Sequence, residues 1–372
     1  CPISPLSTPE EMSLFVRLCD GAAGLVPHNM DAVLAENLRS LFKKKTLISV
    51  ETNGDLSDFI GKIQDGDIPT SSRSGKLILF TSGTTANPKA MVLSGDRLWS
   101  SAVAWADFHD SLDSEARFYN MLPMSYLGGL FNLGLIPLAA GGSAVISDAF
   151  SGATALKFWR EVEENGVNIL WLAPTMLRAL LKLHRPVKKE NAPWKNIRVA
   201  FLGMAGIQLH EKEFFESTFG IPLLENYALS ETTFLTSEKE GQRKRSPGSV
   251  GSSLPWVQLR VQPSGDAKEV AEIQVKTPFL FDGYLGAGGE IGLPLTPDGW
   301  FATGDLGILQ EDVLVLRGRS KDIVKKGGYL LVLRDLEDVA ETHPAVGEAA
   351  AVGIDHPFYG ESAALCLRLT DV

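Results

Sequence analysis

Between residues 76 and 228, short apolar runs alternate with amphipathic stretches of helical period. The apolar runs have the length and composition of strands and lie at 76–80, 117–122, 143–147, 167–172, 197–203 and 221–228. The helical stretches between them are Asp96–His109, Ala153–Asn165, Pro174–His184 and Leu209–Phe219. Apolar strands separated by helices are typical of βαβ units, in which helices cover both faces of a parallel sheet. We therefore predict an α/β fold.

The pattern changes twice further along the chain. After about residue 235, β-rich segments punctuated by Gly and Pro replace the alternation. Near Arg319 a small α+β unit begins, with a helical run at 335–343 and strand-like runs at 348–354 and 362–369. We predict a large N-terminal domain of βαβ-type sheets over 1–320, including a β-rich subdomain at about 236–318. A small, truncated α+β C-terminal domain follows over 321–372.

Charge and cysteine content exclude several classes of function. The 372 residues include 45 acidic and 35 basic side chains, which disfavours nucleic acid or an anionic membrane as the main partner. The three cysteines permit no disulfide framework and have no zinc-ligand spacing, so we expect a cytoplasmic protein. Segment 118–147 has no charged residue, but its prolines and glycines leave no membrane span, and it is predicted to be buried core.

Segment 77–90, LILFTSGTTANPKA, joins a buried strand to a loop rich in hydroxyl groups. Gly83 lets the backbone approach a ligand closely, and successive N–H groups of such a loop bind anions. Lys89 adds a positive charge suited to a phosphate. The hydroxyl donors are Thr81, Ser82, Thr84 and Thr85. The alternatives are a phosphate-binding loop and an ordinary polar loop at a strand end; the P-loop pattern G-x-x-x-x-G-K-[ST] is absent.

This segment resembles the phosphate loop of the AMP-forming acyl-adenylating enzymes. That superfamily contains acyl- and aryl-CoA ligases, peptide-synthetase adenylation domains and luciferase, and this chain is most similar to the acyl-CoA ligase branch. Ala86 and Ala90 stand where the family usually has glycine. The resemblance implies ATP or AMP, Mg²⁺, and coenzyme A or phosphopantetheine as cofactors. Four further segments match the family in order and spacing.

Segment 226–232, NYALSET, resembles the family's Y-G-x-T-E motif. The resemblance implies that Asn226 lies in the nucleotide site, that Tyr227 lies against the adenine, that Ser230 contacts the α-phosphate and that Glu231 holds Mg²⁺. A strand end here would bring an aromatic face, a hydroxyl and a hard oxygen ligand to one place. Taken alone, an aromatic residue and an acid at a strand end are usually structural.

Two later segments also match. Segment 299–307 contains the family's T-G-D, which implies that Asp305 accepts hydrogen bonds from the ribose hydroxyls. Segment 317–329 resembles the hinge motif, so Arg319 would reach the ribose or phosphates and Lys321 would be the hinge. By the same resemblance Gly327 and Gly328 line a channel for the thiol, and Lys325 acts in the second half-reaction. Each segment alone could be a solvated turn.

The acyl site is expected near two apolar segments. Segment 202–208, LGMAGIQ, resembles a loop that borders both adenine and acyl group and so includes Gly203. Segment 122–130 has Leu127 where amino-acid adenylation domains place an aspartate that pairs with the substrate's ammonium group. Burying that ammonium unpaired would cost several kcal/mol, so we expect an acid with a neutral or apolar tail. The predicted pocket walls are Tyr126, Leu127, Gly129, Met204, Ala205 and Leu229.

The resemblance implies an ATP-dependent carboxylic acid ligase that forms acyl-AMP and pyrophosphate and then transfers the acyl group to a thiol, for which we expect coenzyme A. It assigns the catalytic roles to Lys89, Ser230, Glu231 and Lys325. Three alternatives remain open: an enzyme that loads the phosphopantetheine of a carrier protein, a non-catalytic relative that binds acyl-AMP or nucleotide, and an unrelated ATPase or kinase that releases ADP.

Relatives carry a further P-x-x-x-x-G-K motif beyond the G-E pair, which Gly360 and Glu361 match here. Its lysine bridges the carboxylate and the phosphate during adenylation. This sequence reaches Val372 without that motif. The protein could continue past this point, form acyl-AMP slowly, or receive the lysine from a partner; we expect the first.

Overall fold

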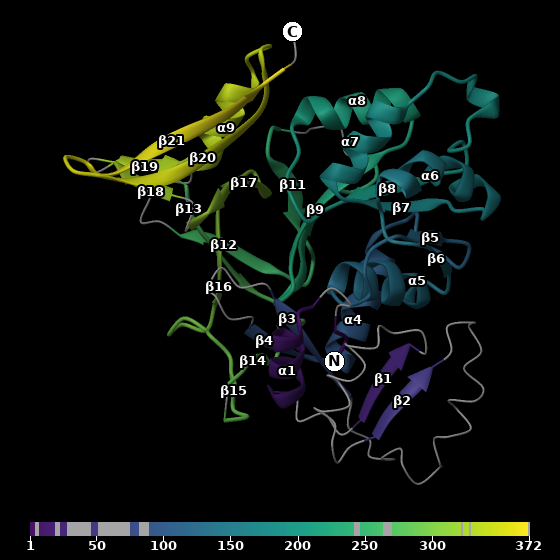
Figure 1. Ribbon diagram of the computed structural model, residues 1–372, viewed down its shortest axis with the longest axis horizontal. Coiled ribbons are helices and arrows are strands. Elements are labelled where there is room, and N and C mark those ends of the chain that lie inside the picture. The colour runs from purple at the N-terminus through teal and green to yellow at the C-terminus, as the bar shows by residue number, and fades with distance from the viewer. Residues whose placement is uncertain are drawn as a thin grey trace.

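The computed structural model describes residues 1–3, 7–18, 23–27, 46–50, 75–81, 89–241, 246–262, 270–286, 288–320, 323–326 and 329–370. Its largest feature is an 11-stranded sheet whose strand order is β12-β13-β16-β17-β11-β10-β9-β8-β7-β5-β6 (Figure 1). The sheet is parallel from β6 to β9 and antiparallel from β9 to β12. The predicted α/β class is therefore confirmed.

The parallel half is built from the strands that the apolar runs predicted. They are β5 (Arg117–Asn120), β6 (Ser143–Ile146), β7 (Ile169–Leu172), β8 (Val199–Leu202) and β9 (Leu223–Leu229). The helices between and before them are α4 (Gly95–Phe108), the π-helix η1 (Gly128–Leu135), α5 (Ile136–Ala139), α6 (Gly152–Glu164), α7 (Pro174–Leu183) and α8 (Leu209–Phe219), with a 3₁₀ turn η2 at Lys189–Asn191. The turn η1 and helix α5 lie within the uncharged segment and were not predicted.

Helices cover both faces of this parallel half. On β7, Ile169 and Trp171 face the core that contains α4 residues such as Trp105, whereas Leu170 and Leu172 face a second core. That second core is formed with α6, α7 and α8. All four residues of the strand are buried. Alternate side chains point to opposite faces of a strand, so a sheet covered on both sides needs continuous apolar runs.

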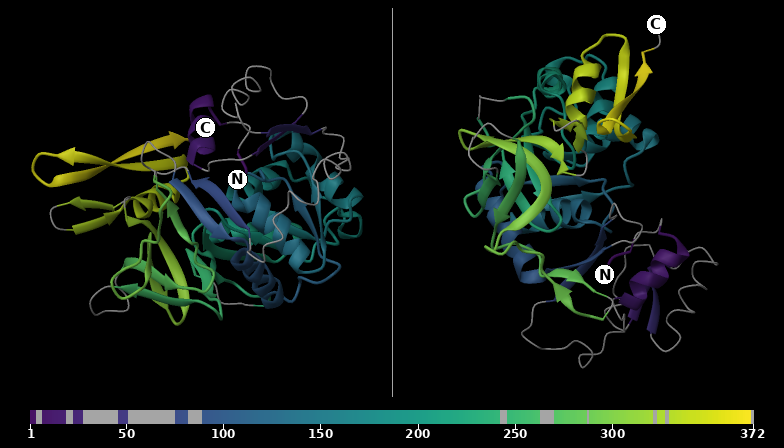
Figure 2. Two further views of the ribbon diagram at one scale, coloured as in Figure 1. Left: turned by 90° about the horizontal axis from the view of Figure 1, so that it is seen from below. Right: turned by 90° about the vertical axis from the view of Figure 1, so that its left-hand side faces the viewer.

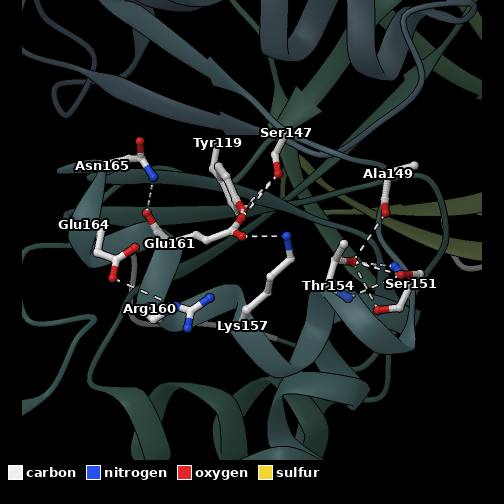
Figure 3. A network of polar contacts seen from close by, with 10 residues as sticks. All are labelled: Tyr119, Ser147, Ala149, Ser151, Thr154, Lys157, Arg160, Glu161, Glu164 and Asn165. Atoms are coloured by element: carbon white, nitrogen blue, oxygen red, sulfur yellow. Dashed lines mark hydrogen bonds and ion pairs between the residues drawn. The ribbon is translucent and has the colours of Figure 1, made fainter.

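Helix α6 is fastened to the sheet by polar contacts, which Figure 3 draws. The hydroxyl of Tyr119 on β5 donates to Ser147 Oγ at 3.2 Å and to the carboxylate of Glu161, which Lys157 also contacts at 2.7 Å. Burial, and next the hydrogen bond to Glu161, raise the pKa of Tyr119 to about 12, so the phenol keeps its proton and donates. Ser151 and Thr154 form a reciprocal capping box at the helix N-terminus.

The antiparallel half continues the same sheet beyond β9. Its strands are β10 (Thr233–Ser237), β11 (Ser249–Ser253), β12 (Gln258–Gln262), β13 (Ala271–Lys276), β16 (Phe301–Gln310) and β17 (Val313–Arg319). Strands β9 and β10 are hydrogen-bonded neighbours, so the β-rich segment and the parallel strands share one sheet. The domain limits at 236, 318 and 320 stay a prediction.

The expectation that residues 76–80 belong to the parallel sheet is wrong. Strand β3 (Lys76–Thr81) pairs antiparallel with β4 (Lys89–Ser94), and β14 (Gly283–Leu285) and β15 (Ile291–Gly292) complete a separate four-stranded sheet. Only residues 82–88 separate β3 from β4. A connection of that length closes a hairpin, whereas a parallel pair needs a crossover of about a dozen residues or more.

The C-terminal unit combines α9 (Leu333–Glu341) with a sheet of order β19-β18-β21-β20. Its strands are β18 (Ile323–Lys326), β19 (Tyr329–Val332), β20 (Val346–His356) and β21 (Gly360–Leu369). The β20–β21 hairpin projects away from the remainder of the molecule (Figure 2, yellow). Near the N-terminus lie α1 (Pro9–Leu18) and the parallel pair β1 (Ala23–Pro27) and β2 (Thr46–Val50). In the described ranges, no helix is both long and apolar enough to cross a membrane.

Candidate active site

The predicted site residues gather where β8 and β9 end. Gly203 directly follows β8, Asn226 and Tyr227 lie on β9, and Ser230 and Glu231 form the turn that leads to β10. The carboxyl ends of parallel strands meet at one edge of a sheet, which is where α/β proteins bind ligands. Asn226 is buried, and its amide Nδ2 donates to Leu202 O at 2.9 Å, which holds the end of β9 against β8.

Tyr227, Asp305 and Arg319 form one connected polar group. The Tyr227 hydroxyl donates to Asp305 Oδ2 at 2.7 Å, and Arg319 Nε lies 3.2 Å from Asp305 Oδ1. Asp305 and Arg319 face each other across β16 and β17, and Gly304 makes the preceding bend with a φ of +75°, which favours glycine. Burial, and next the Asp305 charge, raise the pKa of Tyr227 well above its ordinary value. The buried carboxylate is thus oriented from two sides.

Glu231 is held by the segment that enters β14. The Tyr284 hydroxyl donates to Glu231 Oε1 at 2.6 Å, and the Phe281 backbone N–H donates to the Glu231 carbonyl at 2.7 Å. Lys89 Nζ, at the start of β4, lies 5.1 Å from the centre of the Tyr284 ring, in the range of a cation–π contact. Burial, and next the hydrogen bond to Glu231, raise the pKa of Tyr284. Tyr284 therefore joins Lys89, at the end of the predicted phosphate loop, to the carboxylate that is predicted to be the Mg²⁺ ligand.

A cavity of about 110 Å³ lies beside these residues. Four of the six predicted pocket walls line it, namely Tyr126, Leu127, Met204 and Leu229, together with Gly203, Asn226 and Ser230 from the predicted nucleotide set. Six lining residues were not predicted: Gly128, Phe131, Asn132, Ala228, Thr233 and Phe234. None of the lining residues that the structure describes carries a charge.

Tyr126 and Met204 meet at the mouth of this cavity. The Tyr126 hydroxyl lies 3.4 Å from Met204 Sδ, and the two side chains are 36% and 51% exposed. Met204 has a φ of +74°, a left-handed conformation that few residues other than glycine adopt. Backbone strain of this kind is found most often at functional sites.

Two predicted pocket walls lie outside the lining. Ala205 is exposed in the loop after β8. Gly129 is buried against the backbone of Leu122 and Pro123, where an added Cβ would come within 2.3 Å of the Pro123 carbonyl oxygen. Gly129 thus permits a close backbone approach behind the pocket. Its neighbours in η1, which has π-helical hydrogen bonding, reach the cavity instead.

Several predicted residues fall outside the described part of the chain. They are Ser82, Gly83, Thr84 and Thr85 of the phosphate loop, the hinge residue Lys321, and Gly327 and Gly328. Thr81 ends β3 and Lys325 lies on β18, and only their backbone is described.

A larger hollow of about 710 Å³ separates α7 and α8 from the C-terminal unit. Gln208 Nε2, before α8, donates to Asp338 Oδ1 on α9 at 2.6 Å across this hollow. Arg178 on α7 pairs with Glu211 at 2.6 Å. No local sequence pattern predicts these contacts, because the partners are far apart in the chain.

Comparison with known proteins agrees with this arrangement. The family model described as AMP-binding enzyme matches residues 1–285. The chain is 30% identical to malonate–CoA ligase of Arabidopsis thaliana and 31% identical to sulfoacetate–CoA ligase of Cupriavidus necator, each time over 77% of this chain. The chain spans about half the length of these relatives, 49% and 55%. The crystal structure of ATP-bound MatB from Rhodopseudomonas palustris superposes with a TM-score of 0.83 and 26% identity, covering 98% of this chain and 72% of that one.

Proposed function

Because the chain belongs to the AMP-binding enzyme family, we propose that it is the ATP- and acid-binding part of an AMP-forming carboxylic acid–thiol ligase, with coenzyme A as the thiol. The observation that carries the proposal is that two polar groups, Tyr227–Asp305–Arg319 and Lys89–Tyr284–Glu231, meet the segment at the end of β9. Their members Tyr227 and Glu231 directly follow Asn226 and Ser230, which line one uncharged cavity. The first group suits a nucleoside and the second a polyphosphate.

In the proposed first step, an oxygen of the acid's carboxylate attacks the α-phosphorus of ATP, and the bond to pyrophosphate breaks. Asp305 accepts hydrogen bonds from the ribose hydroxyls, and Tyr227 packs against the adenine. Lys89 and the phosphate loop bind the triphosphate and offset its charge. The acyl-AMP then reacts with the thiol, which releases AMP.

The residues present fit a bound Mg²⁺. The Tyr284 hydroxyl donates to Oε1 of Glu231. The other carboxylate oxygen, Oε2, has no hydrogen bond to any described residue and could bind a cation. Across the described ranges no cluster of three or more His, Cys, Asp or Glu side chains could hold a metal ion, so the ion would be shared between Glu231 and the phosphates. When bound, Mg²⁺ would neutralise negative charge on the phosphates.

The acid in this proposal is small and has a neutral or apolar tail. The uncharged lining of the cavity and its volume of about 110 Å³ support this choice. The names of the relatives, which are CoA ligases, favour coenzyme A over a carrier protein as the acceptor. A cytoplasmic location, expected from the low cysteine content, belongs to the same proposal.

Carboxylate-dependent exchange of pyrophosphate into ATP tests the proposal, because it requires reversible formation of acyl-AMP. We expect Glu231→Gln and Asp305→Ala each to abolish the exchange, whereas Glu163→Gln, an exposed acid on α6, keeps the wild-type rate. Full exchange in either site variant would contradict the assignment. Release of ADP in place of AMP would point to a kinase or ATPase, and nucleotide binding without exchange to a non-catalytic relative.

A further inference from the structure

The cavity differs chemically from what the named relatives require. We propose that it takes the tail of a short-chain acid with a single carboxylate, that it excludes a second anionic group, and that Phe131 and Phe234 set its depth. This inference rests on the proposed function and deepens it by naming the class of acid.

The charge argument comes from the polar groups of the wall. Malonate and sulfoacetate, the acids in the names of the two relatives, carry a second anionic group. In this cavity one N–H of the Asn226 amide donates to Leu202 O, and the other is a neutral donor. The hydroxyl of Thr233 is shared between Ser101 and the Thr232 carbonyl at 2.7 and 2.6 Å. Asn132 is a neutral amide. A second anion would therefore enter without a cation among the described residues, at a cost of several kcal/mol.

The depth of the cavity is set by two phenylalanines from different elements. Phe131 of η1 and Phe234 of β10 are each 1% exposed, and their ring centres are 5.8 Å apart. Trp105 of α4 stacks on Phe234 with ring centres 3.7 Å apart and an interplanar angle of 29°. Trp171 of β7 contacts Phe234 from another side at 5.4 Å. Because these rings are close-packed, they cannot move far to make room for a longer ligand, so this wall of the cavity is rigid.

The volume then limits the tail. Pockets that bury a drug-sized ligand measure about 300–1,000 Å³, whereas this cavity measures about 110 Å³. We therefore expect a propanoyl or butanoyl tail to end before the packed rings of Phe131 and Phe234. An octanoyl tail should meet these rings unless Phe131 is shortened.

Binding of stable acyl-adenylate mimics tests the proposal independently of turnover. The probes are 5′-O-(N-acylsulfamoyl)adenosines with propanoyl, octanoyl and malonyl groups, titrated calorimetrically into the 372-residue chain. We expect the propanoyl compound to bind at least about tenfold more tightly than each of the other two. A few extra methylene groups against a rigid wall, or one unpaired charge, should each lower the affinity by more than that factor. In the Phe131→Ala variant we expect the affinity for the octanoyl compound to rise about tenfold relative to the affinity for the propanoyl compound.

Phe131→Leu provides a second variant in case the alanine variant fails to fold, and it should shift the preference in the same direction. Phe158→Leu is the matched control: Phe158 is equally buried, at 1%, but it belongs to the core on the opposite face of the sheet. An unchanged preference in both Phe131 variants, or an equal shift in Phe158→Leu, would overturn the role of Phe131. Tighter binding of the malonyl compound to the wild type would overturn the charge argument.

Turnover with the free acids separates this inference from the proposed function. A higher rate of AMP release with propanoate than with octanoate or malonate supports both the proposed function and this inference. If malonate is the preferred acid for AMP release, the proposed ligase function is supported but the proposed class of acid is refuted. If the mimics bind in the expected order but no acid yields AMP, the proposed reaction fails and the assignment of the cavity stands.

Discussion

Tyr284 is the residue whose role the sequence did not suggest. It lies 53 positions from Glu231, yet its hydroxyl contacts that carboxylate and its ring lies under Lys89. Strand β14 carries it alongside β4, where Tyr284 faces Met91 in the register. Because the hydrogen bond to Oε1 fixes the orientation of the carboxylate group, it also fixes the direction in which Oε2 points. Tyr284 is thus a positioning residue for Glu231.

Replacing Tyr284 by phenylalanine removes that hydrogen bond and keeps the ring. We expect kcat/KM for ATP in the exchange reaction to fall about tenfold, as is typical when an outer-shell partner of a metal ligand is lost. We also expect half-maximal exchange to require more Mg²⁺. The Mg²⁺ titration is the decisive measurement, because a purely structural tyrosine would not move it. Tyr359→Phe, on the exposed β20–β21 turn, serves as the control.

Helix α8 and strands β9 and β10 meet at a buried charge cluster. Lys212 of α8 is fully buried; its Nζ lies 3.0 Å from Glu225 Oε1 and also contacts the Glu238 carboxylate. The Glu225 backbone N–H donates to Glu238 Oε2 at 2.9 Å. Glu225 directly precedes Asn226, so the cluster fixes the strand that carries the cavity wall.

We expect Lys212→Met to lower the free energy of unfolding by about 3–5 kcal/mol, because it removes the Lys212 ammonium from beside two buried carboxylates. Urea unfolding measures this change. Lys182→Met, which removes an exposed lysine from the last turn of α7, should change the free energy by less than about 0.5 kcal/mol. Equal stabilities of the two variants would show that the cluster contributes little.

Glu240, in the turn that follows β10, contacts the end of α4. Its carboxylate lies 3.3 Å from Nδ1 of the buried His109 and accepts from Ser111 Oγ at 2.8 Å. Burial alone would raise the pKa of Glu240, but the hydrogen bond and charge of His109, together with Ser111, outweigh it and lower the pKa from 4.5 to about 2. A carboxyl group whose pKa is lower in the folded state stabilises the fold above its unfolded pKa.

The stability that Glu240 contributes should therefore be complete above about pH 4.5 and lost as the pH falls towards 2. We expect Glu240→Gln to lower the free energy of unfolding by about 1.5–3 kcal/mol at pH 7, the range for a hydrogen bond to a charged group. The difference from wild type should shrink between pH 4.5 and pH 2 in urea unfolding. A difference independent of pH would contradict the linkage; Glu213→Gln, an exposed acid on α8, is the control.

In the molecule as a whole, the C-terminal unit faces helices α7 and α8 across a polar hollow. The hydrogen bond from Gln208 to Asp338 joins the loop before α8 to α9, and it spans 130 positions of sequence. The loop that contains Gln208 begins at Gly203 and Met204, which line the cavity. The placement of the C-terminal unit is therefore connected through one loop to the cavity wall that we propose to bind the acid.

Removal of this contact should loosen the C-terminal unit without unfolding it. We expect amide hydrogen exchange in α9 to become about fivefold faster in Asp338→Ala, which corresponds to about 1 kcal/mol for one hydrogen bond. Asp355→Ala, at the exposed end of β20, should leave the exchange in α9 unchanged. Unaltered exchange in Asp338→Ala would mean that the other contacts of the interface suffice.

The sequence alone determined the α/β class, the strands and, except for η1 and α5, the helices between residues 117 and 228. It also determined the segments that carry Tyr227, Glu231, Asp305 and Arg319. These features are local: a strand buried on both faces needs a continuous apolar run, and a phosphate or nucleotide site needs particular residue types at short spacing. The absence of charge from the part of the pocket wall at 126–132 was likewise visible in segment 118–147.

Only the tertiary structure decided which strands pair and which distant side chains meet. The β3–β4 hairpin, the contact of Tyr284 with Glu231, and the Phe131–Phe234 wall each join residues from different elements. An apolar run has the same composition whether the strand beside it is parallel or antiparallel. The sequence around a tyrosine on one strand likewise does not indicate which distant carboxylate it will contact. Chain topology and side-chain packing supply that information, because they bring distant residues into contact.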